Sequence, residues 1–342
     1  FGCCNLTNKK FHIFNEEYSQ EEYVKKVEQL KKEPHVREKV DTFVYNQIHK
    51  FYHGFYTERS SGDYIRNVKK AFNCFNCRDA EVLRHSQDAH EQRYCIDMTE
   101  VLLQDFCIHI EGCYKNSNSG FSMKVNESSD IWYSSHIYWS EHTLGSVWVK
   151  SGKNILLNMS YSENEYQALA AKLVAHMVNT WEFGKHFPIK DSPFPYNETT
   201  AHEYFPMTKS QALNFGFRWK DEEKISATSP TILDIWQYDE RVVGSEQAQS
   251  NINTLLAQKL ICEVTWKPYG MQKRELAFYV ENSIQIPQLH PDERYKRRMW
   301  RRNPRRLNDI ACQKCSKELQ STYAADAPQK VYCEECYREE VF

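Results

Sequence analysis

Four cysteines near the C-terminal end carry the clearest chemistry in the sequence. Cys312 and Cys315 form one C-x2-C pair, and Cys333 and Cys336 form a second pair after a spacer of seventeen residues. Two intervening residues let both thiolates of a pair face one ion from a tight turn, and the second pair completes a tetrahedron. The spacing predicts a structural zinc site with Zn²⁺ as the cofactor. Because protein fills all four positions, the site predicts a stabilising role and leaves no position for a substrate.

Two disulfides are the alternative use of these four cysteines, and they require an oxidising compartment. The other eight of the twelve cysteines do not form a disulfide framework. We therefore expect reduced thiols and an intracellular location, either cytoplasmic or associated with a virion.

A basic stretch precedes the cysteine pairs. It has no acidic residue and carries eight positive charges in thirteen positions, at Arg294, Lys296, Arg297, Arg298, Arg301, Arg302, Arg305 and Arg306. Arginine forks onto phosphate oxygens, and the interleaved Tyr295 and Trp300 can stack on bases. The stretch predicts a contact with nucleic acid or with an acidic protein surface. A solvated helix face is the alternative that such a charge run also permits.

A second pair of zinc-knuckle-like segments lies further upstream, around Cys262 and His290. The position three residues after Cys262 is Thr265, and His290 has no cysteine partner. Two ligands do not make a stable structural zinc site. We therefore expect a ribbon-like fold without metal, held by packing of its apolar and aromatic residues, Trp266, Tyr269, Leu276, Phe278 and Tyr279.

The composition excludes several classes of protein. The 342 residues carry a net charge of -2, so no global field directs the chain toward nucleic acid or a membrane. No run of eighteen apolar residues occurs, which predicts no transmembrane helix and no membrane partner. The first residues lack the layout of a signal peptide, and we expect the chain to be part of a longer protein.

Residues 64–157 contain short apolar segments at intervals of roughly ten to twelve residues, separated by polar residues. Such spacing predicts an all-β solenoid, in which each coil buries its inner face against the next coil. A β-sandwich is the competing interpretation. Cysteines recur at inward positions of the predicted coils, as small apolar fillers would. Cys74 and Cys77 form a further C-x2-C pair, which can be either half of a metal site or two buried free thiols.

An internal repeat appears at an offset of 143 residues. Seven identities fall in a gap-free window, pairing Gly2, Lys10, Asn15, Tyr18, Ser19, Glu22 and Tyr23 with Gly145, Lys153, Asn158, Tyr161, Ser162, Glu165 and Tyr166. Both copies include a capping box, Ser19 with Glu22 and Ser162 with Glu165, which predicts a helix start. The chain is thus expected to hold two copies of a strand-turn-helix unit.

Further helices are expected over residues 36–51, 166–181 and 246–260, and a short helix is expected after a capping box at Thr208 and Gln211. The passage 187–199 is rich in proline and aromatic residues, which predicts an ordered strap over a surface. Residues 220–245 are charged and polar, which predicts a linker.

Several motifs together resemble a known family. They include Ser192-Pro193-Phe194-Pro195-Tyr196-Asn197-Glu198-Thr199, Glu275-Leu276-Ala277-Phe278-Tyr279, His290-Pro291-Asp292 and Val331-Tyr332-Cys333-Glu334-Glu335-Cys336-Tyr337. These motifs resemble an uncharacterised family of repeat-containing zinc-ribbon proteins that is common in candidate-phyla bacteria and large DNA viruses. The resemblance implies metal binding by the four C-terminal cysteines and implies no activity. The second repeat departs from richer members because Ser146 and Val147 stand where the first copy has Cys3 and Cys4.

The predicted fold is mainly β with peripheral helices, a short-strand β-solenoid-like domain followed by a C-terminal zinc-ribbon module. The expected division is 1–63 as the strand-helix end of a first repeat, 64–186 as the solenoid-like second repeat, 187–245 as strap and linker, 246–311 as degenerate ribbon with a basic helix, and 312–342 as the Cys4 zinc ribbon.

The sequence favours a non-enzymatic architectural or binding protein that contacts nucleic acid through the arginine-rich stretch. A structural protein of a large assembly, such as a virion or ribonucleoprotein, is the alternative. A weaker alternative is a solenoid enzyme acting on polysaccharides, for which Asp97, Glu100, Asp105 and Glu111 are the candidate carboxylates.

Overall fold

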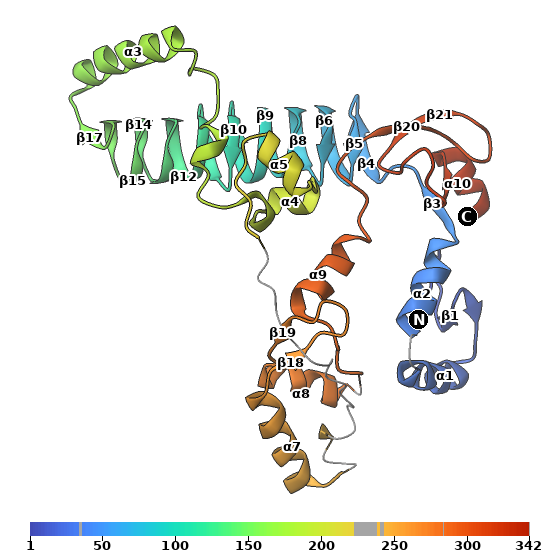
Figure 1. The fold of residues 1–342 in the computed structure, drawn as a ribbon. Helices are drawn as coiled ribbons and strands as arrows, with labels where there is room; N and C mark the ends of the chain where they lie inside the picture. The colour runs from blue at the N-terminus through green and yellow to red at the C-terminus, as the bar shows by residue number, and fades with distance from the viewer. Residues whose placement is uncertain (34–35, 222–237, 240–242, 283, 342) are drawn as a thin grey trace. The chain divides into compact units, whose positions relative to one another are not determined.

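The computed structural model describes residues 1–33, 36–221, 238–239, 243–282 and 284–341 (Figure 1). The chain divides into two compact units. Unit 1 contains residues 1–49, 221–303 and 339–342, and unit 2 contains residues 50–220 and 304–338.

Unit 2 is built around a β-solenoid, drawn in blue to green in Figure 1, in which all strand pairs are parallel except that of β17, which pairs antiparallel with β16. The strands are β4 (Gly54–Glu58), β5 (Gly62–Asp63), β6 (Ile65–Phe72), β7 (Cys74–Phe75), β8 (Arg78–Arg84), β9 (Gln87–Asp105), β10 (Ile108–Glu111), β11 (Tyr114–Ser117), β12 (Gly120–Trp132), β13 (Ser135–Tyr138), β14 (Glu141–Leu144), β15 (Val147–Lys150), β16 (Lys153–Leu156) and β17 (Met159–Ser160).

One coil of the solenoid takes twelve residues. Arg66 pairs with Arg78, which pairs with His90 one coil later. Within a coil every third residue points inward, as shown by the fully buried Val68, Ala71 and Cys74. The predicted solenoid is confirmed, and the sandwich alternative is excluded for this region because the paired strands are parallel.

A residue with positive φ precedes each inward residue. Asn67, Lys70 and Asn73 have φ of 50°, 52° and 56°, and the same three-residue rhythm continues along the solenoid. Each residue in this left-handed conformation forms a corner of the coil. Four corners, spaced three residues apart, therefore complete one coil of twelve residues. Asn and Asp tolerate this conformation, whereas bulkier residues adopt it only where surrounding structure holds them. Here the stacked ladders on both sides supply that constraint.

The interior changes character along the rod. Its first coils are filled by aliphatic side chains and by the buried free thiols of Cys74, Cys77, Cys95, Cys107 and Cys113. Later coils place serines inside. Ser134 Oγ donates to Trp132 O at 2.8 Å and accepts the N–H of Ser146 at 3.1 Å, one coil later. Each inward hydroxyl of this kind satisfies a backbone donor that no strand partner reaches, so the buried polar interior carries little desolvation cost.

Helix α3 (Glu163–Asn179) covers one side of the solenoid and begins with the predicted capping box. In Figure 1 it runs above the strands β12 to β17. Its Tyr166, Leu169 and Leu173 pack against Phe121 and Leu144 of the coils. The helix starts at Glu163 rather than at the expected residue 166, because the capping box of Ser162 and Glu165 makes Ser162 the N-cap.

The Pro- and aromatic-rich strap is ordered around one tyrosine. Tyr196 is 4% exposed, and its hydroxyl donates to Phe205 O at 2.7 Å. The strap comprises η1 (Ile189–Asp191), η2 (Tyr196–Glu198), α4 (Thr200–Tyr204) and α5 (Lys209–Asn214). Helix α5 begins with the predicted capping box of Thr208 and Gln211.

The N-terminal part of unit 1 contains a hairpin and two helices, namely β1 (His12–Ile13), β2 (Glu16–Glu17), α1 (Gln20–Lys32) and α2 (Val36–Tyr45), followed by β3 (Ile48–Lys50). The expected helix over 36–51 is therefore too long. The chain leaves the helix after Tyr45, and the last of the expected helical residues form the strand β3 instead.

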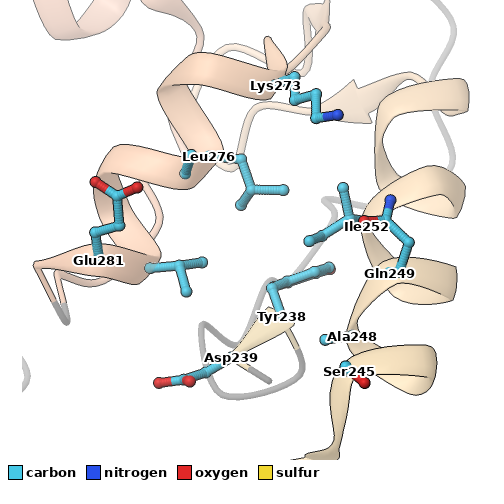
Figure 2. A pocket seen from close by; sticks show the side chains of 11 residues that line it. Tyr238, Asp239, Ser245, Ala248, Gln249, Ile252, Lys273, Leu276 and Glu281 are labelled. Atoms are coloured by element: carbon cyan, nitrogen blue, oxygen red, sulfur yellow. The ribbon is translucent and has the colours of Figure 1, made fainter. Parts of the chain in front are cut away.

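The second part of unit 1 contains α7 (Ser245–Ala257), β18 (Leu260–Ile261), β19 (Pro268–Tyr269), α8 (Lys273–Glu281) and α9 (Pro291–Met299). Figure 2 shows Ile252 of α7 and Leu276 of α8 facing one another across a cavity of about 400 Å³. The cavity is lined mainly by apolar groups, with Tyr238 and Asp239 at one side. Most of the expected linker 220–245 lies outside the described residues.

The expected domain boundary at residue 64 is displaced. Strand β4, which begins at Gly54, already pairs with β6 in the solenoid sheet. The solenoid thus starts about one coil earlier than the apolar pattern indicates, because β4 carries exposed Phe55 and Tyr56 in place of a buried inward series.

Candidate metal centre

The C-terminal module of unit 2 brings the four predicted cysteines together. Strands β20 (Asn308–Ala311) and β21 (Glu318–Ser321) pair antiparallel, and the turn between them carries Cys312 and Cys315. Strand β22 (Lys330–Tyr332) leads directly to Cys333, and α10 (Glu334–Val341) begins one residue later and carries Cys336. A hairpin and a helix start thus present one C-x2-C pair each.

Backbone bonds hold the first knuckle. Cys312 N–H donates to Lys317 O at 2.9 Å, and Ser316 N–H donates to Cys312 O at 2.8 Å. Ser316 adopts a φ of 61°, which closes the turn tightly enough for both sulfurs to face inward. Gln313 N–H donates to Val331 O at 3.1 Å and ties this knuckle to the strand that leads to the second pair.

The sulfur geometry fits a tetrahedral thiolate site. One ligand atom from each of Cys312, Cys315, Cys333 and Cys336 lies within 4.8 Å of the others. The Sγ atoms of Cys315 and Cys333 are 3.7 Å apart. A tetrahedron with metal–sulfur bonds of about 2.3 Å has sulfur–sulfur edges of about 3.8 Å. The four cysteines can therefore hold one metal ion.

Backbone donors prepare one thiol for ionisation. Burial raises the pKa of Cys312, but hydrogen bonds from the backbone of Cys333, Cys315 and Lys314 outweigh it and lower the pKa to about 6. Burial and hydrogen bonding to the other thiols raise the pKa of Cys336. A thiolate at Cys312 would give a cation an anionic ligand, and a bound cation would favour ionisation of the other three thiols.

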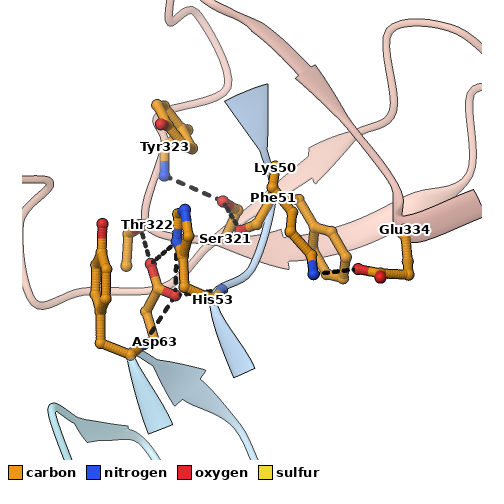
Figure 3. Close-up of polar contacts among 9 residues, drawn as sticks. Lys50, Phe51, His53, Asp63, Ser321, Thr322, Tyr323 and Glu334 are labelled. Atoms are coloured by element: carbon orange, nitrogen blue, oxygen red, sulfur yellow. Dashed lines mark hydrogen bonds and ion pairs between the residues drawn. The ribbon is translucent and has the colours of Figure 1, made fainter. Parts of the chain in front are cut away.

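The C-terminal module with its four cysteines, the ribbon, packs on the first coils of the solenoid through buried polar contacts, shown in Figure 3. Thr322 Oγ1 donates to Asp63 Oδ2 at 3.0 Å, and Ser321 Oγ donates to Phe51 O at 2.6 Å. Asp63, Ser321 and Thr322 are at most 3% exposed. Lys50 Nζ lies 2.7 Å from a carboxylate oxygen of Glu334 at the rim of this contact.

Asp63 is the hub of the docking contact. Its carboxylate also accepts the backbone N–H of His53 at 2.7 Å and that of Tyr64 at 2.9 Å. Burial raises the pKa of Asp63, but hydrogen bonds from His53 and Thr322, together with the charge of His53, lower it overall. The ionised carboxylate is thus the form that the solenoid and the ribbon jointly stabilise.

Arg305 makes a second connection between the ribbon and the solenoid. Its guanidinium donates to both carboxylate oxygens of Asp88, at 2.6 and 2.9 Å, and to Gln87 Oε1 at 2.8 Å. It also lies over the Tyr204 ring, 4.1 Å from the centroid, and its side chain is only 7% exposed. A bidentate, stacked arginine is worth far more than an exposed ion pair.

The upstream knuckle retains the frame of a zinc knuckle. Cys262 N–H donates to Lys267 O at 3.0 Å and Trp266 N–H donates to Cys262 O at 3.0 Å, as in the Cys312 turn. Trp266 has a φ of 58°, close to that of Ser316. Among the described residues, Cys262 and His290 belong to no group of three or more potential metal ligands. Of the residues expected to pack here, Tyr269 and Leu276 are buried in one apolar cluster and Tyr279 packs against it. Trp266 and Phe278 are exposed, so the prediction that they pack in this core is wrong.

The eight basic residues of the arginine-rich stretch have different surroundings. Arg294 donates to Glu275 at 2.6 Å and to Tyr279 at 3.1 Å, and Arg297 donates to Glu293 at 3.1 Å. Arg301 pairs with Asp41, and Arg305 pairs with Asp88. Lys296, Arg298 and Arg306 are exposed and have no ion pair among the described residues, and Arg302 contacts the Met299 sulfur. Half of the stretch is therefore engaged within the protein.

The four candidate carboxylates are spread around the coil. Asp97 lies 3.2 Å from His109, whereas the pKa of Glu111 is raised by its burial and then by Glu100. Asp105 pairs with Ser117 in the next coil, five residues along the coil from Glu100. This dispersion gives the polysaccharide-enzyme hypothesis no support.

Sequence reasoning missed the residues that join the ribbon to the solenoid. Asp63, Thr322 and Asp88 carry no local motif, since their partners lie more than 200 positions away or arrive from another element. The one available signal was Arg305, which belongs to the basic stretch but lies beyond its helix α9.

No family model matches the chain, and no curated protein matches it. Among solved structures, 40% of the chain is similar to the crystal structure of a hexapeptide transferase family protein from Anaplasma phagocytophilum, of which 92% is covered, at 11% sequence identity and a TM-score of 0.12. Within the described part of the chain, every helix is too short or too polar to cross a membrane.

Proposed function

We propose that the chain is a non-enzymatic architectural protein in which a zinc ribbon closes one end of a β-solenoid rod. The observation that carries the proposal is the buried Asp63–Thr322 contact, because it joins the first coils of the solenoid to the metal module. An uncovered edge of a β-sheet pairs readily with other chains, so a rod needs a cap. The four-thiolate site supplies the cap with the stability that a thirty-residue module cannot draw from its own core.

Zinc is the metal that we propose. Four thiolates in a tetrahedron suit Zn²⁺, which has no preference for another geometry, and they leave it no open position for chemistry. None of the twelve cysteines is in a disulfide, which supports a reducing intracellular compartment.

Metal content and capping can be measured on the whole protein. We expect one zinc per chain by elemental analysis, and we expect a chelator to lower the unfolding temperature of the solenoid as well as that of the ribbon. Exchange of the amide protons of β4 and β6 should accelerate after chelation. Loss of metal without any change in the exchange of these strands would contradict the capping role.

We also propose that the exposed end of α9 contacts nucleic acid. Lys296 and Arg298 remain without acidic partners among the described residues, and Trp300 beside them is 88% exposed. Cationic side chains next to an exposed indole suit single-stranded nucleic acid, because the cations would contact its phosphates and the indole would stack on its bases. An acidic protein surface would use the charges and not the indole.

A filter-binding titration over a salt series tests this contact with single-stranded DNA and RNA. We expect the affinity to fall steeply with salt, with a slope reduced by roughly one unit for each phosphate contact removed. The Lys172→Ala/Lys190→Ala variant, which removes two exposed lysines elsewhere, is the matched control for Lys296→Ala/Arg298→Ala. Binding that is absent, or that both double variants weaken equally, would refute the nucleic-acid contact.

A further inference from the structure

One outward-facing column of the solenoid is apolar over the later coils, with one residue in each coil. Strand pairing aligns Ile108 with Gly120, Trp132 with Leu144, and Leu144 with Leu156. A Cβ atom at Gly120 would lie 2.5 Å from a ring carbon of Trp132, so the indole lies over this glycine. The ring thereby keeps the apolar column continuous from Ile108 to Leu156.

Helix α3 covers this column over the later coils only. Its Tyr166, Leu169 and Leu173 belong to the apolar cluster that contains Leu156, and Ile108 packs at the edge of that cluster. A helix rises about 1.5 Å per residue and coils lie about 4.8 Å apart, so roughly every third helix residue meets a new coil. The column therefore suits a helix that runs along it. In Figure 1, α3 ends before it reaches the strands β9, β8 and β6.

The column continues over three coils that α3 does not reach. Phe72 pairs in register with Arg84, and Arg84 pairs with Ile96. Phe72 and Ile96 are 47% and 39% exposed, and Tyr94 and Phe106 at the adjoining corner are 50% and 60% exposed. We call these five residues the open column. A contiguous group of exposed apolar side chains is typical of an interaction site.

Basic side chains lie in and beside the open column. Four of them are exposed and form no ion pair within the part of the chain that the structure describes, namely Lys69, Lys70, Arg84 and Arg93. The acidic residues nearby are fewer. Glu81 stands between Lys69 and Arg93 in the strand pairing, Asp105 precedes Phe106, and Asp97 pairs with His109. Basic charge is therefore in excess around the open column.

The aromatic rings of the open column have faces that are already in use. Tyr94 and Phe106 stack on one another with centroids 4.9 Å apart and an interplanar angle of 4°. The Arg84 guanidinium lies over the Phe72 ring, 5.9 Å from its centroid. Ring edges and the aliphatic Ile96 remain for a partner. These groups suit aliphatic side chains better than they suit nucleic acid bases, which need free ring faces.

We propose that the open column binds an amphipathic α-helix of a partner protein, whose apolar stripe continues the track of α3 and whose flanking residues are acidic. Continuity with the α3 contact indicates a helix, and the excess of basic charge selects acidic flanks. Three coils accommodate roughly ten residues of helix, which is about three turns. The inference is independent of the metal site and of the contact with nucleic acid.

A pair of synthetic peptides tests the proposal on the full chain. Both have the sequence of residues 162–180, which carries an apolar stripe that already fits the column. The acidic peptide contains Gln167→Glu, Lys172→Glu and His176→Glu, and the basic peptide contains Gln167→Lys and His176→Lys. Fluorescence anisotropy measures the Kd of each labelled peptide over a salt series. The acidic peptide should bind at least about tenfold more tightly than the basic one, with a smaller difference at high salt.

Variants of the protein locate the binding site. Ile96→Ser/Phe106→Ser should weaken binding of the acidic peptide by at least about tenfold, since it removes apolar contacts at the centre of the site. Val147→Ser/Trp148→Ser, which alters an exposed apolar pair on another side of the coil, is the matched control and should change the Kd less than about twofold. Arg84→Glu/Arg93→Glu should reverse the preference, so that the basic peptide binds more tightly.

Several results would overturn the proposal. The first is that neither peptide binds at about 100 μM, and the second is that Ile96→Ser/Phe106→Ser binds the acidic peptide as tightly as the wild type, as it would if the peptide only displaced α3. A third is an unchanged preference in Arg84→Glu/Arg93→Glu. The fourth is that Ile96→Ser/Phe106→Ser abolishes self-association of the chain or binding of an oligothymidine strand while peptide binding is absent, which would assign the open column to that other occupant.

Discussion

Asp63 is the residue at which solenoid and metal module depend on one another. Its carboxylate is 1% exposed and accepts bonds from the solenoid backbone, from His53 and from Thr322 of the ribbon. A buried carboxylate with such partners is stabilising only while it is ionised. Its ionisation therefore couples the stability of the capped end to pH.

The sign of this coupling follows from the lowered pKa of Asp63. The stabilisation is complete above the ordinary aspartate range and is lost as pH falls through the lowered pKa of the folded state. Asp63→Asn should cost about 1–3 kcal/mol near neutral pH, because it removes a charged acceptor from several buried donors. Chemical denaturation from pH 7 to pH 3 should show a smaller acid loss in Asp63→Asn than in the wild type. Parallel pH curves for the two proteins would be evidence against this role.

Cys333 provides the sharpest test of the metal site among the cysteines. Cys333→Ser leaves three thiolates, and we expect the zinc content to drop from one per chain to well below one, with rapid exchange in the last thirty residues. Cys262→Ser is the matched control, since it alters an equivalent knuckle that has no set of metal ligands among the described residues. It should retain one zinc. Full zinc content in Cys333→Ser would rule out the four-cysteine site.

At the scale of elements, the inward serines of the later coils, such as Ser134, lead to a separate prediction. Ser134→Ala should destabilise the solenoid by about 1–3 kcal/mol, because the buried Ser146 N–H then loses its acceptor. Ser117→Ala is the control, as the Ser117 side chain is exposed. Equilibrium denaturation measures both. A Ser134→Ala protein as stable as Ser117→Ala would show that these hydroxyls do not support the stack.

The elements differ in how far the sequence could predict them. Capping boxes at Ser19, Ser162 and Thr208 marked helix starts correctly, since a cap is a local interaction. The coil repeat was visible in the apolar spacing, but its inward period of three was obscured because Ser134 and Gln92 occupy inward positions alongside Val68. A polar residue can be inward only when the next coil satisfies it, and one segment of sequence does not contain that partner.

The end of the second helix shows the same limit. Residues 46–51 continue a helical apolar pattern, yet the chain leaves the helix after Tyr45 and forms the strand β3. Long-range contacts within unit 2 decide the docking of the ribbon. The clustering of the four cysteines was predictable because two residues of spacing define a knuckle, whereas Asp63 and Thr322 became partners only through the fold.

At the scale of the whole molecule, the arginine-rich stretch divides into structural and exposed charges. Arg305→Ala should lower the unfolding temperature by several degrees, because a buried bidentate pair with Asp88 is left with one member. Lys296→Ala/Arg298→Ala should leave that temperature within about a degree, since both side chains are exposed. Thermal unfolding of the two variants, side by side, separates the roles. The opposite ranking would mean that the exposed charges carry the fold.

Because each coil takes twelve residues and adjacent strands lie about 4.8 Å apart, the length of the rod can change only in steps. A duplication or deletion of twelve residues adds or removes one coil. Every later side chain then keeps the same direction relative to the axis of the solenoid. Any gain or loss that is not a multiple of three would turn the interior outward. The gene segment encoding this region should therefore tolerate length variation in units of thirty-six nucleotides. The number of such units sets the length of the solenoid, so evolution can adjust the distance that it spans without rebuilding its core.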